Sequence, residues 1–183
     1  MDSGGHFTQE VYEQCRIRQA KRVFAIKGKG GENIPYISTK PSKVVINGNS
    51  KRTAWLYIIG VDAGKQVIMS NLKVETPGAS FCHFPRGEER GYDTHYFNGL
   101  LSEKLVLSKT KTGNRWVWEK IPGHQRNEPL DCRNYANAAF KVWNPDLDNI
   151  FASEGVNKVS SSNLNCGCAC KHHFNYVIRR GDS

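Results

Sequence analysis

The acids around residue 130 are the first candidates for chemistry in this chain of 183 residues. A helix is predicted over 129–143, with an apolar stripe formed by Tyr135, Ala138 and Val142. Extended back by one turn, that stripe reaches Asp131, and a carboxylate on a packed face is normally neutralised, paired or bound to a cation. Glu128 lies three residues earlier on the same face, which would bring two acids together. The alternative is that both acids only complement the positive N-terminus of the helix, and spacing alone leaves the two open.

A second candidate is Asp2, which is followed by Ser3, Gly4, Gly5 and His6. Two glycines after an acid suit a sharp turn from a strand end into a helix that begins near Thr8. Carboxylates at strand ends, facing a carboxylate on a helix, can hold divalent cations for phosphodiester cleavage. Two such ions about 3.5–4 Å apart stabilise both the attacking and the leaving oxygen. Asp2 taken alone carries little information.

Asp62 also follows a predicted strand, in a segment that superficially resembles a phosphate-binding loop. Gly60 and the Gly64-Lys65 pair are one residue too close for G-x-x-x-x-G-K, and Gln66 replaces the Ser or Thr. We therefore expect no ATP site in this chain. Asp62 is expected to be a turn or cap residue rather than a metal ligand, because Asp favours those positions.

The six cysteines fall into two groups. Cys15, Cys82 and Cys132 are scattered, and without a secretory signal we expect reduced and mostly buried thiols. The others form a cluster near the C-terminus that consists of Cys166, Cys168 and Cys170 with His172 close behind. Residues 166 and 170 have a spacing that suits zinc, but a second, separated ligand pair is missing, so a zinc site is only an alternative here.

The elements that would position these groups alternate between helices and strands. Helices are expected over Thr8 to about Ala20 with Thr8 as N-cap, over Tyr92–Ser102 with Asp93 near its start, and over Pro129–Trp143. Strands are expected at 22–27, 44–46, 54–59 and 81–84, with a further hairpin formed by 105–107 and 116–118. The segment that ends at Leu72 is expected to be helical or extended. This alternation predicts an α/β domain with a mixed sheet.

The charge of the chain favours a polyanionic partner. Lys and Arg number 26 against 17 Asp and Glu, which gives a formal charge of +9, and the stretch from Arg16 to Lys29 contains no acid. The composition excludes a fully disordered, collagen-like or coiled-coil chain. No apolar run approaches the roughly 20 residues of a membrane span, and the start resembles no signal peptide. We expect a protein that is neither secreted nor bound to a membrane.

Six segments, taken in order, resemble the nuclease domain of phage lambda-type terminase large subunits. They are Asp2-Ser3-Gly4-Gly5-His6-Phe7-Thr8 with Val11-Tyr12 and Cys15-Arg16, Arg22-Val23-Phe24-Ala25-Ile26-Lys27-Gly28, Ile59-Gly60-Val61-Asp62 with Lys65, His83-Phe84-Pro85-Arg86, Asn127-Glu128, and Leu130-Asp131-Cys132-Arg133 with Tyr135-Ala136. The resemblance implies a ribonuclease H-like fold and an endonuclease, dependent on Mg²⁺ or Mn²⁺ in a two-metal site, that cuts concatemeric viral DNA during packaging. It implies double-stranded viral DNA, the terminase small subunit and the portal as partners, in the cytoplasm of the bacterial host.

The resemblance also assigns roles to individual residues. Asp2 and Asp131 are implied as catalytic, metal-binding carboxylates, with Glu128 as an additional candidate ligand. The implied DNA contacts are Lys27, Arg86, Arg126 and Arg133, for each of which a solvated surface position is the alternative.

Two departures from the family pattern shape the remaining expectations. The opening strand that should carry the first carboxylate would precede Asp2, and the ATPase motor is missing as well. We therefore expect an N-terminally truncated terminase: a ribonuclease H-like sheet lacking its first strands over 1–143, and a loosely ordered polar tail with the Cys/His cluster over 144–183. Such a chain should have weak or no nuclease activity in isolation. The alternatives are a noncatalytic DNA-binding or assembly module, or a nonfunctional prophage remnant.

Overall fold

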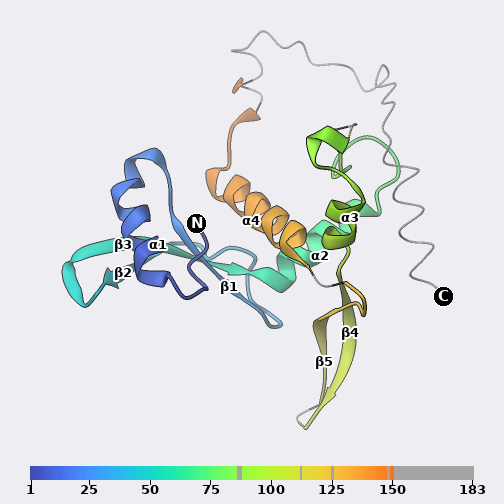
Figure 1. Ribbon diagram of the computed structural model, residues 1–183, viewed down its shortest axis with the longest axis horizontal. Helices are drawn as coiled ribbons and strands as arrows, with labels where there is room; N and C mark the ends of the chain where they lie inside the picture. Colours follow the sequence, from blue (N-terminus) through green and yellow to red (C-terminus); the bar gives the residue numbers. More distant parts are fainter. Residues whose placement is uncertain (86–87, 112, 125, 148, 151–183) are drawn as a thin grey trace.

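The fold is that of a computed structural model, which describes residues 1–85, 88–111, 113–124, 126–147 and 149–150 (Figure 1). In chain order the elements are α1 (Thr8–Ile17), β1 (Ala25–Lys29), β2 (Ser42–Ile46), β3 (Asn49–Gly60), α2 (Val61–Leu72), α3 (Thr94–Leu100), β4 (Glu103–Thr110), β5 (Gly113–Lys120) and α4 (Glu128–Trp143), with short 3₁₀ turns at Gln19–Lys21 and Glu88–Arg90. The predicted α/β class is confirmed. None of the helices in these residues is long and apolar enough to cross a membrane.

The first three strands form a mixed sheet in the order β1-β3-β2. β3 pairs in parallel with β1 and antiparallel with β2, so the prediction of a mixed sheet is confirmed. The β2–β3 turn has left-handed φ angles at Asn47 (48°) and Gly48 (71°). These angles suit an Asn-Gly hairpin turn.

The first residues of the chain extend this sheet beyond β1. Asp2 forms a parallel bridge with Ile26: Ser3 N–H donates to the Ile26 carbonyl and Ile26 N–H donates to the Met1 carbonyl, both at 2.9 Å. The glycines after Asp2 suggested a strand end there, although the opening strand of the family pattern was expected to be missing. Asp2 lies on a short extended segment that is hydrogen-bonded to β1.

Helix α1 packs against the sheet and closes a first core. The core cluster consists of Tyr12, Cys15, Ala25, Ile46, Ala54 and Leu56. Thr8 is not the N-cap that was predicted, because the helix is capped by Phe7 and already includes Thr8. The Thr8 hydroxyl is 2.9 Å from the carbonyls of both Ser3 and Gly5, so it ties the glycine turn to the helix. The predicted start of β1 at Arg22 is also wrong, because Arg22 has a left-handed φ of 58° that ends the preceding turn.

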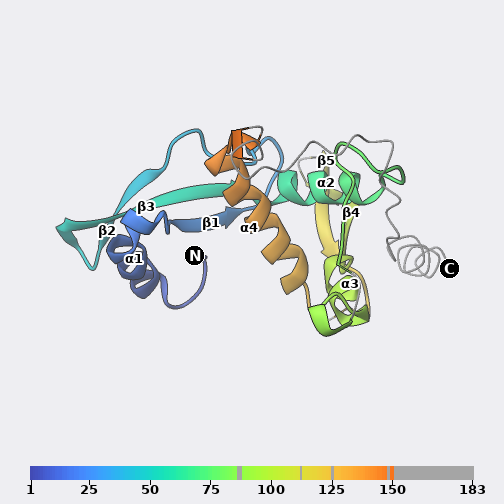
Figure 2. The same ribbon diagram turned by 90° about the horizontal axis from the view of Figure 1, so that it is seen from above.

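A second core joins α2, α3 and α4 at the other end of the molecule from α1 (Figure 2). Its buried members are Ile68, Leu72, Phe84, Phe97, Leu100 and Leu130. The strand predicted at 81–84 is absent; the segment is irregular, and the Phe84 ring lies edge-on to Phe97 with 5.1 Å between the centroids. Helix α3 is shorter than predicted, but Asp93 caps it by accepting a hydrogen bond from Tyr96 N–H at 2.8 Å.

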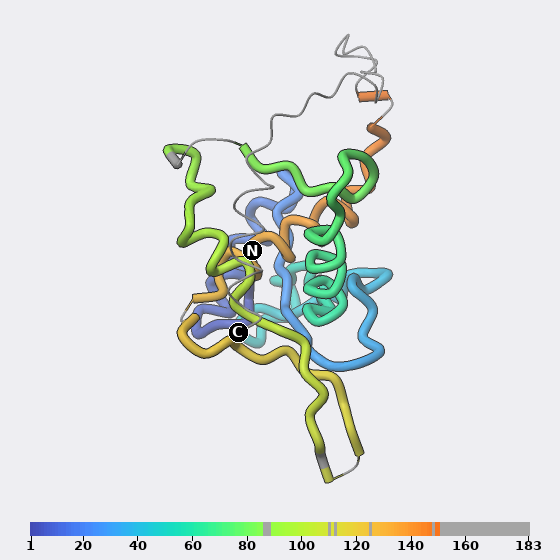
Figure 3. The backbone as a smooth tube through the Cα atoms, turned by 90° about the vertical axis from the view of Figure 1, so that its right-hand side faces the viewer, coloured from blue at the N-terminus to red at the C-terminus, as the bar shows by residue number. Residues whose placement is uncertain are grey.

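Strands β4 and β5 form a separate two-stranded antiparallel hairpin, as predicted. The hairpin projects away from the rest of the molecule (Figure 3). Helix α4 runs between the two cores, and its buried residues are Leu130, Asn134 and Ala138. Ala138 of the predicted stripe is therefore buried as expected, whereas Asp131, Tyr135 and Val142 are half-buried at the margin of the buried face.

Candidate active site

Asp131 lies in the first turn of α4 and is half-buried. The residue that precedes the helix, Asn127, donates a hydrogen bond from Nδ2 to Asp131 Oδ2 at 3.2 Å. This hydrogen bond restricts the rotamer of the Asp131 side chain. The carboxylate is therefore positioned rather than loosely solvated.

The same amide of Asn127 connects Asp131 to a buried ion pair. Asn127 Nδ2 donates to Glu103 Oε1 at 2.7 Å, and Glu103 Oε2 accepts from Lys65 Nζ at 2.6 Å. The Lys65 and Glu103 side chains are only 10% and 6% exposed. Lys65 comes from α2 and Glu103 opens β4, so three elements converge on Asp131. We call these four residues the Asp131 network.

The pKa of Asp131 reflects burial and several surrounding charges, among them that of Asp2. Burial raises the pKa of the Asp131 carboxyl, Lys65 counteracts this, and the negative charges of Glu103, Asp2 and Glu128 raise the pKa further. Tyr135 is one turn further along α4, and burial together with Asp2 and Asp131 raises its pKa to about 12. Asp2 and Asp131, 129 positions apart in the sequence, thus both raise the pKa of Tyr135.

Asp2 itself is exposed, and its Oδ1 accepts a hydrogen bond from Gly4 N–H at 2.9 Å. It lines a groove of about 1280 Å³ between α4 and the sheet, together with Tyr135. The groove is otherwise largely apolar, with walls that include Phe24, Ile26, Phe140 and Trp143. Asp2 and the Tyr135 hydroxyl are thus polar groups within an apolar groove.

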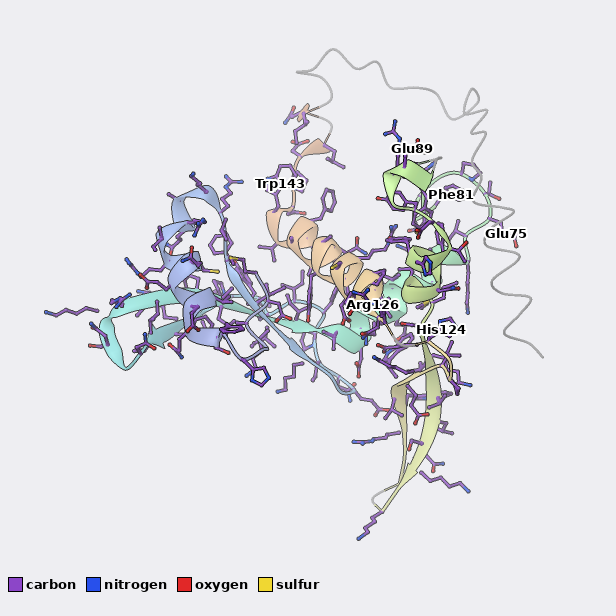
Figure 4. All side chains as sticks on the ribbon, in the orientation of Figure 1. Glu75, Phe81, Glu89, His124, Arg126 and Trp143 are labelled. Atoms are coloured by element: carbon purple, nitrogen blue, oxygen red, sulfur yellow. The ribbon has the colours of Figure 1, made fainter. Side chains whose placement is uncertain are left out.

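Glu128 is more exposed than Asp131, although its negative charge contributes to raising the pKa of Asp131. Its side chain is 59% exposed and pairs with Arg126 at 3.3 Å. The pKa of Glu128 is lowered, chiefly by a hydrogen bond to its own backbone N–H and further by Arg126. Figure 4 shows Arg126 where α4 begins and Trp143 at the opposite end. Glu128 therefore occupies the position of an acid in the first turn of a helix, the alternative that the spacing had left open.

Asp62 has a structural partner, since its Oδ2 accepts a hydrogen bond from Gly31 N–H at 2.7 Å. This bond ties the start of α2 to the loop after β1, although Asp62 is not the cap of α2, whose N-cap is Gly60. The neighbouring glycines allow close packing: a Cβ at Gly60 would lie 2.4 Å from the Pro35 carbonyl oxygen, and one at Gly64 would lie 1.9 Å from Asn134 Oδ1.

The four candidate DNA contacts differ in their surroundings. Lys27 and Arg126 are exposed, on β1 and before α4. Arg133 instead lies 4.8 Å from the Phe84 ring centroid and hydrogen-bonds to Tyr96, so its guanidinium belongs to the second core. Arg86 lies outside the described residues, as does the cluster of Cys166, Cys168, Cys170 and His172.

The remaining cysteines are free thiols within the described part of the chain. Cys15 is buried, which raises the pKa of its thiol, whereas Cys82 is half-buried and Cys132 is exposed. The expectation of mostly buried thiols therefore fits Cys15 best.

The described residues around Asp131 offer few ligands for a divalent cation. Among the described residues, no group of three or more His, Cys, Asp or Glu is arranged to hold a metal ion. Glu103 has both oxygens engaged by Lys65 and Asn127, which leaves Asp2 and Asp131 as the available carboxylates. Mg²⁺ is commonly bound by one or two carboxylates together with substrate phosphates and water, so this pair suits a metal that shares its ligands with a nucleic acid.

Three members of the Asp131 network were not predicted from the sequence to be site residues: Glu103, Lys65 and Asn127. Lys65 and Asn127 appeared only within matched segments, and Glu103 follows an apparent helix end without any local signal. Lys65 and Glu103 are 38 positions apart, so the ion pair exists only in the folded chain.

Comparison with known proteins identifies the family. Residues 1–150 match the family described as "Terminase large subunit gpA, endonuclease domain". The chain belongs to the terminase large subunit endonuclease family. This terminase nuclease chain is 29% identical over 155 residues to the "Terminase, large subunit" of Enterobacteria phage P21, covering 80% of the chain and 23% of that protein. It is 28% identical over 160 residues to the "Terminase, large subunit" of Escherichia phage lambda, covering 83% of the chain and 24% of that protein.

The terminase nuclease chain thus spans about a quarter of the length of these relatives. No solved structure matches it significantly. The assignment of a mixed α/β architecture therefore rests on the strands and helices described above.

Proposed function

We propose that this chain is a divalent-metal-dependent endonuclease module that cuts viral DNA for packaging. The observation that supports the proposal is that Asp2, from the segment beside β1, lines one groove with Tyr135, which lies one turn along α4 from Asp131. The charge of Asp2 also contributes to raising the pKa of Asp131. In this proposal, Asp2 and Asp131 bind Mg²⁺ or Mn²⁺, with further ligands from DNA phosphates. A ribonuclease H-like core would accommodate this arrangement.

The protein groups have distinct tasks in this proposal. Asp131 presents one oxygen to the cation while Asn127 holds the other, and the Lys65–Glu103 pair keeps Asn127 oriented. A divalent cation at this position would stabilise negative charge on the attacked phosphate and lower the pKa of a bound water. The basic surface would supply attraction for the DNA backbone.

The assignment of partners follows the family. The relatives are named terminase large subunits, and we propose that the present chain acts on double-stranded viral DNA in the bacterial cytoplasm, with a small subunit and a portal. Because Asp2 and Asp131 are the two carboxylates available at this site among the described residues, we expect weak cleavage by the isolated chain.

The test is Mn²⁺ binding followed by plasmid nicking. We expect the wild-type chain to bind Mn²⁺ in the presence of a short duplex, measured by electron paramagnetic resonance, and to nick supercoiled plasmid slowly. Asp131→Asn and Asp2→Asn should lose both properties. Glu128→Gln is the matched control and should retain them, because Glu128 is exposed and paired with Arg126. Absence of Mn²⁺ binding by the wild-type chain, or equal nicking by Asp131→Asn, would refute the proposal.

A noncatalytic DNA-binding or assembly module is the second candidate. It is favoured by the lack of a three-ligand group among the described residues. This candidate predicts metal-independent DNA binding that is unaffected by Asp131→Asn, so the same variants separate the two functions.

A further inference from the structure

The β4–β5 hairpin exposes an apolar stripe on one of its two faces. Side chains alternate between the faces of a strand, so Leu105 and Leu107 share a face, and the residues directly opposite them are Trp118 and Trp116. Leu107 and Trp116 are each 52% exposed and Leu105 is 37% exposed. A two-stranded ribbon with so much exposed apolar area is typical of a binding surface.

Positive charge surrounds this stripe. The cations of the hairpin are Lys104, Lys109, Lys111, Arg115 and Lys120. Its acids are Glu103, which is buried against Lys65, and Glu119. Three of the cations, Lys109, Lys111 and Arg115, lie close to the tip, where they are exposed.

The root of the hairpin is firmly held. Ser102 is fully buried, its hydroxyl donates to the Gly99 carbonyl at 2.8 Å, and its own carbonyl accepts from Ile121 N–H at 2.8 Å. Along the strand, Trp116 N–H donates to Glu32 Oε1 at 2.8 Å. The hairpin is thus fixed at its base and along its length while its tip projects from the body (Figures 1 and 3).

The same root belongs to the candidate active site. Glu103 is the first residue of β4 and a member of the Asp131 network. At about 3.3 Å per residue, Lys109 lies about 20 Å along the strand from Glu103. That length is a little over half of the roughly 34–36 Å helical turn of DNA, so an arm of this size reaches phosphates well away from the cleaved bond.

We propose that the β4–β5 hairpin is an arm that binds duplex DNA beside the candidate active site, an inference that rests on the proposed function. The tip cations contact phosphates, and the stripe of Leu107 and Trp116 lies against sugars and base edges in a groove. Two-stranded ribbons fit the major groove of DNA, and apolar side chains are used against base steps by groove-binding proteins. The three exposed cations near the tip favour DNA over a protein partner, because an ordinary apolar interface would supply them with no counter-charge.

The test measures DNA binding without metal. Binding of the full chain to a fluorescein-labelled duplex of about 30 base pairs, long enough for the reach estimated above, is followed by anisotropy in EDTA across a salt series. The hairpin variant combines Lys109→Ala, Lys111→Ala and Arg115→Ala. We expect its affinity to fall at least about tenfold and its salt slope to decrease by about 2.7, the value for three lost phosphate contacts. Trp116→Ala should weaken binding about fivefold without changing the salt slope, consistent with loss of an apolar contact.

The matched control has the same change in charge elsewhere on the surface. It combines Lys21→Ala, Lys40→Ala and Lys51→Ala, three exposed lysines of the sheet region. We expect this variant to lose less than about threefold in affinity, because it removes only general attraction. Equal losses in the two triple variants, or unchanged binding by the hairpin variant, would overturn the proposal.

Two further readouts keep the result interpretable. Thermal unfolding followed by circular dichroism confirms that the hairpin variants fold, and Trp116→Phe should restore most of the affinity lost in Trp116→Ala. Light scattering tests a second copy of the chain as the occupant: a wild-type dimer that Trp116→Ala dissociates, with DNA binding unaffected, would also overturn the proposal. Because the assay contains no metal, loss of binding in the hairpin variant is informative whether or not the chain cleaves DNA.

Discussion

The Lys65–Glu103 pair places two opposite charges in the interior, next to a carboxylate that must remain accessible. A buried ion pair is rarely a source of net stability, because desolvation of both ions offsets their attraction. Here the pair has a second contact, the hydrogen bond from Asn127 to Glu103 at 2.7 Å. Its value to the protein is therefore positional, since it fixes the residue that in turn holds Asp131.

Removal of one partner should be costly for the fold. Glu103→Gln leaves the Lys65 ammonium buried without a counter-charge, and we expect the free energy of unfolding to fall by about 3–5 kcal/mol, measured by urea denaturation. The double variant Lys65→Met/Glu103→Leu should recover most of this loss. Glu128→Gln, which breaks the exposed pair with Arg126, serves as the control and should leave stability unchanged. A Glu103→Gln protein as stable as wild type would show that the pair is not desolvated.

Asp131 should lower the free energy of unfolding by an amount that depends on pH. Its folded pKa is raised above the usual value of 3.8, chiefly by burial, so the folded state binds the proton more tightly than the unfolded state. The carboxyl therefore destabilises the fold once the pH exceeds the unfolded value, and this destabilisation grows until the pH passes the folded pKa. We expect metal-free Asp131→Asn to be more stable than wild type at pH 7.5, with the gain shrinking towards pH 4 in denaturant titrations. A gain that grows as the pH falls would contradict the assignment.

At the scale of elements, the close contact of α2 with α4 depends on Gly64 having no side chain. A Cβ at Gly64 would lie 1.9 Å from Asn134 Oδ1 and 2.3 Å from the Tyr36 ring. Asn134 is fully buried and donates to the Val61 carbonyl at 3.0 Å, so it has little freedom to move. Lys65 follows Gly64 directly, and thus the same close approach places Lys65 near Glu103.

The direction in which Gly64→Ala changes the stability of the protein tests whether α2 and α4 are closely packed. In an exposed helix the change would stabilise by about 1 kcal/mol through helix propensity. Here we expect a loss of about 1–3 kcal/mol by overpacking, measured by thermal unfolding. Gly5→Ala is the matched control, because nothing lies within 4 Å of its added Cβ, and it should be nearly neutral. A stabilised Gly64→Ala protein would mean that the two helices can separate freely.

At the scale of the whole molecule, the basic residues behind the net charge of +9 differ in their surroundings: some form ion pairs within the fold, and others are exposed. Part of the basic stretch near residue 16 is paired within the fold: Glu13 binds Arg16 at 2.7 Å and Arg52 at 2.9 Å, and Arg16 is the leading cause that lowers the pKa of Glu13 to about 2. The remaining basic residues of that stretch are exposed, as are the tip cations of the hairpin.

The sequence by itself determined the elements whose signals are local. The Asn47-Gly48 turn, the β4–β5 hairpin and the Pro129-initiated helix follow from turn chemistry and propensity, which act over a few residues. The ordered motifs likewise sufficed to identify the family from Asp2 to Ala136. The strand predicted at 81–84 failed because the burial of Phe84 among aromatic rings, a tertiary effect, also produces a short apolar run.

Only the tertiary structure decided which charged groups meet. Sequence spacing predicted that Glu128 lies near Asp131, and the charge of Glu128 does contribute to raising the pKa of Asp131. The links from Asp131 through Asn127 to Glu103 and Lys65, and the influence of Asp2, come from segments that are distant in the sequence. In this part of α4 the buried residues are Leu130 and Asn134 rather than Asp131 and Tyr135, and Asn134 packs closely against Gly64. Helical periodicity gives the face of a helix only approximately, whereas a close contact with another helix fixes it.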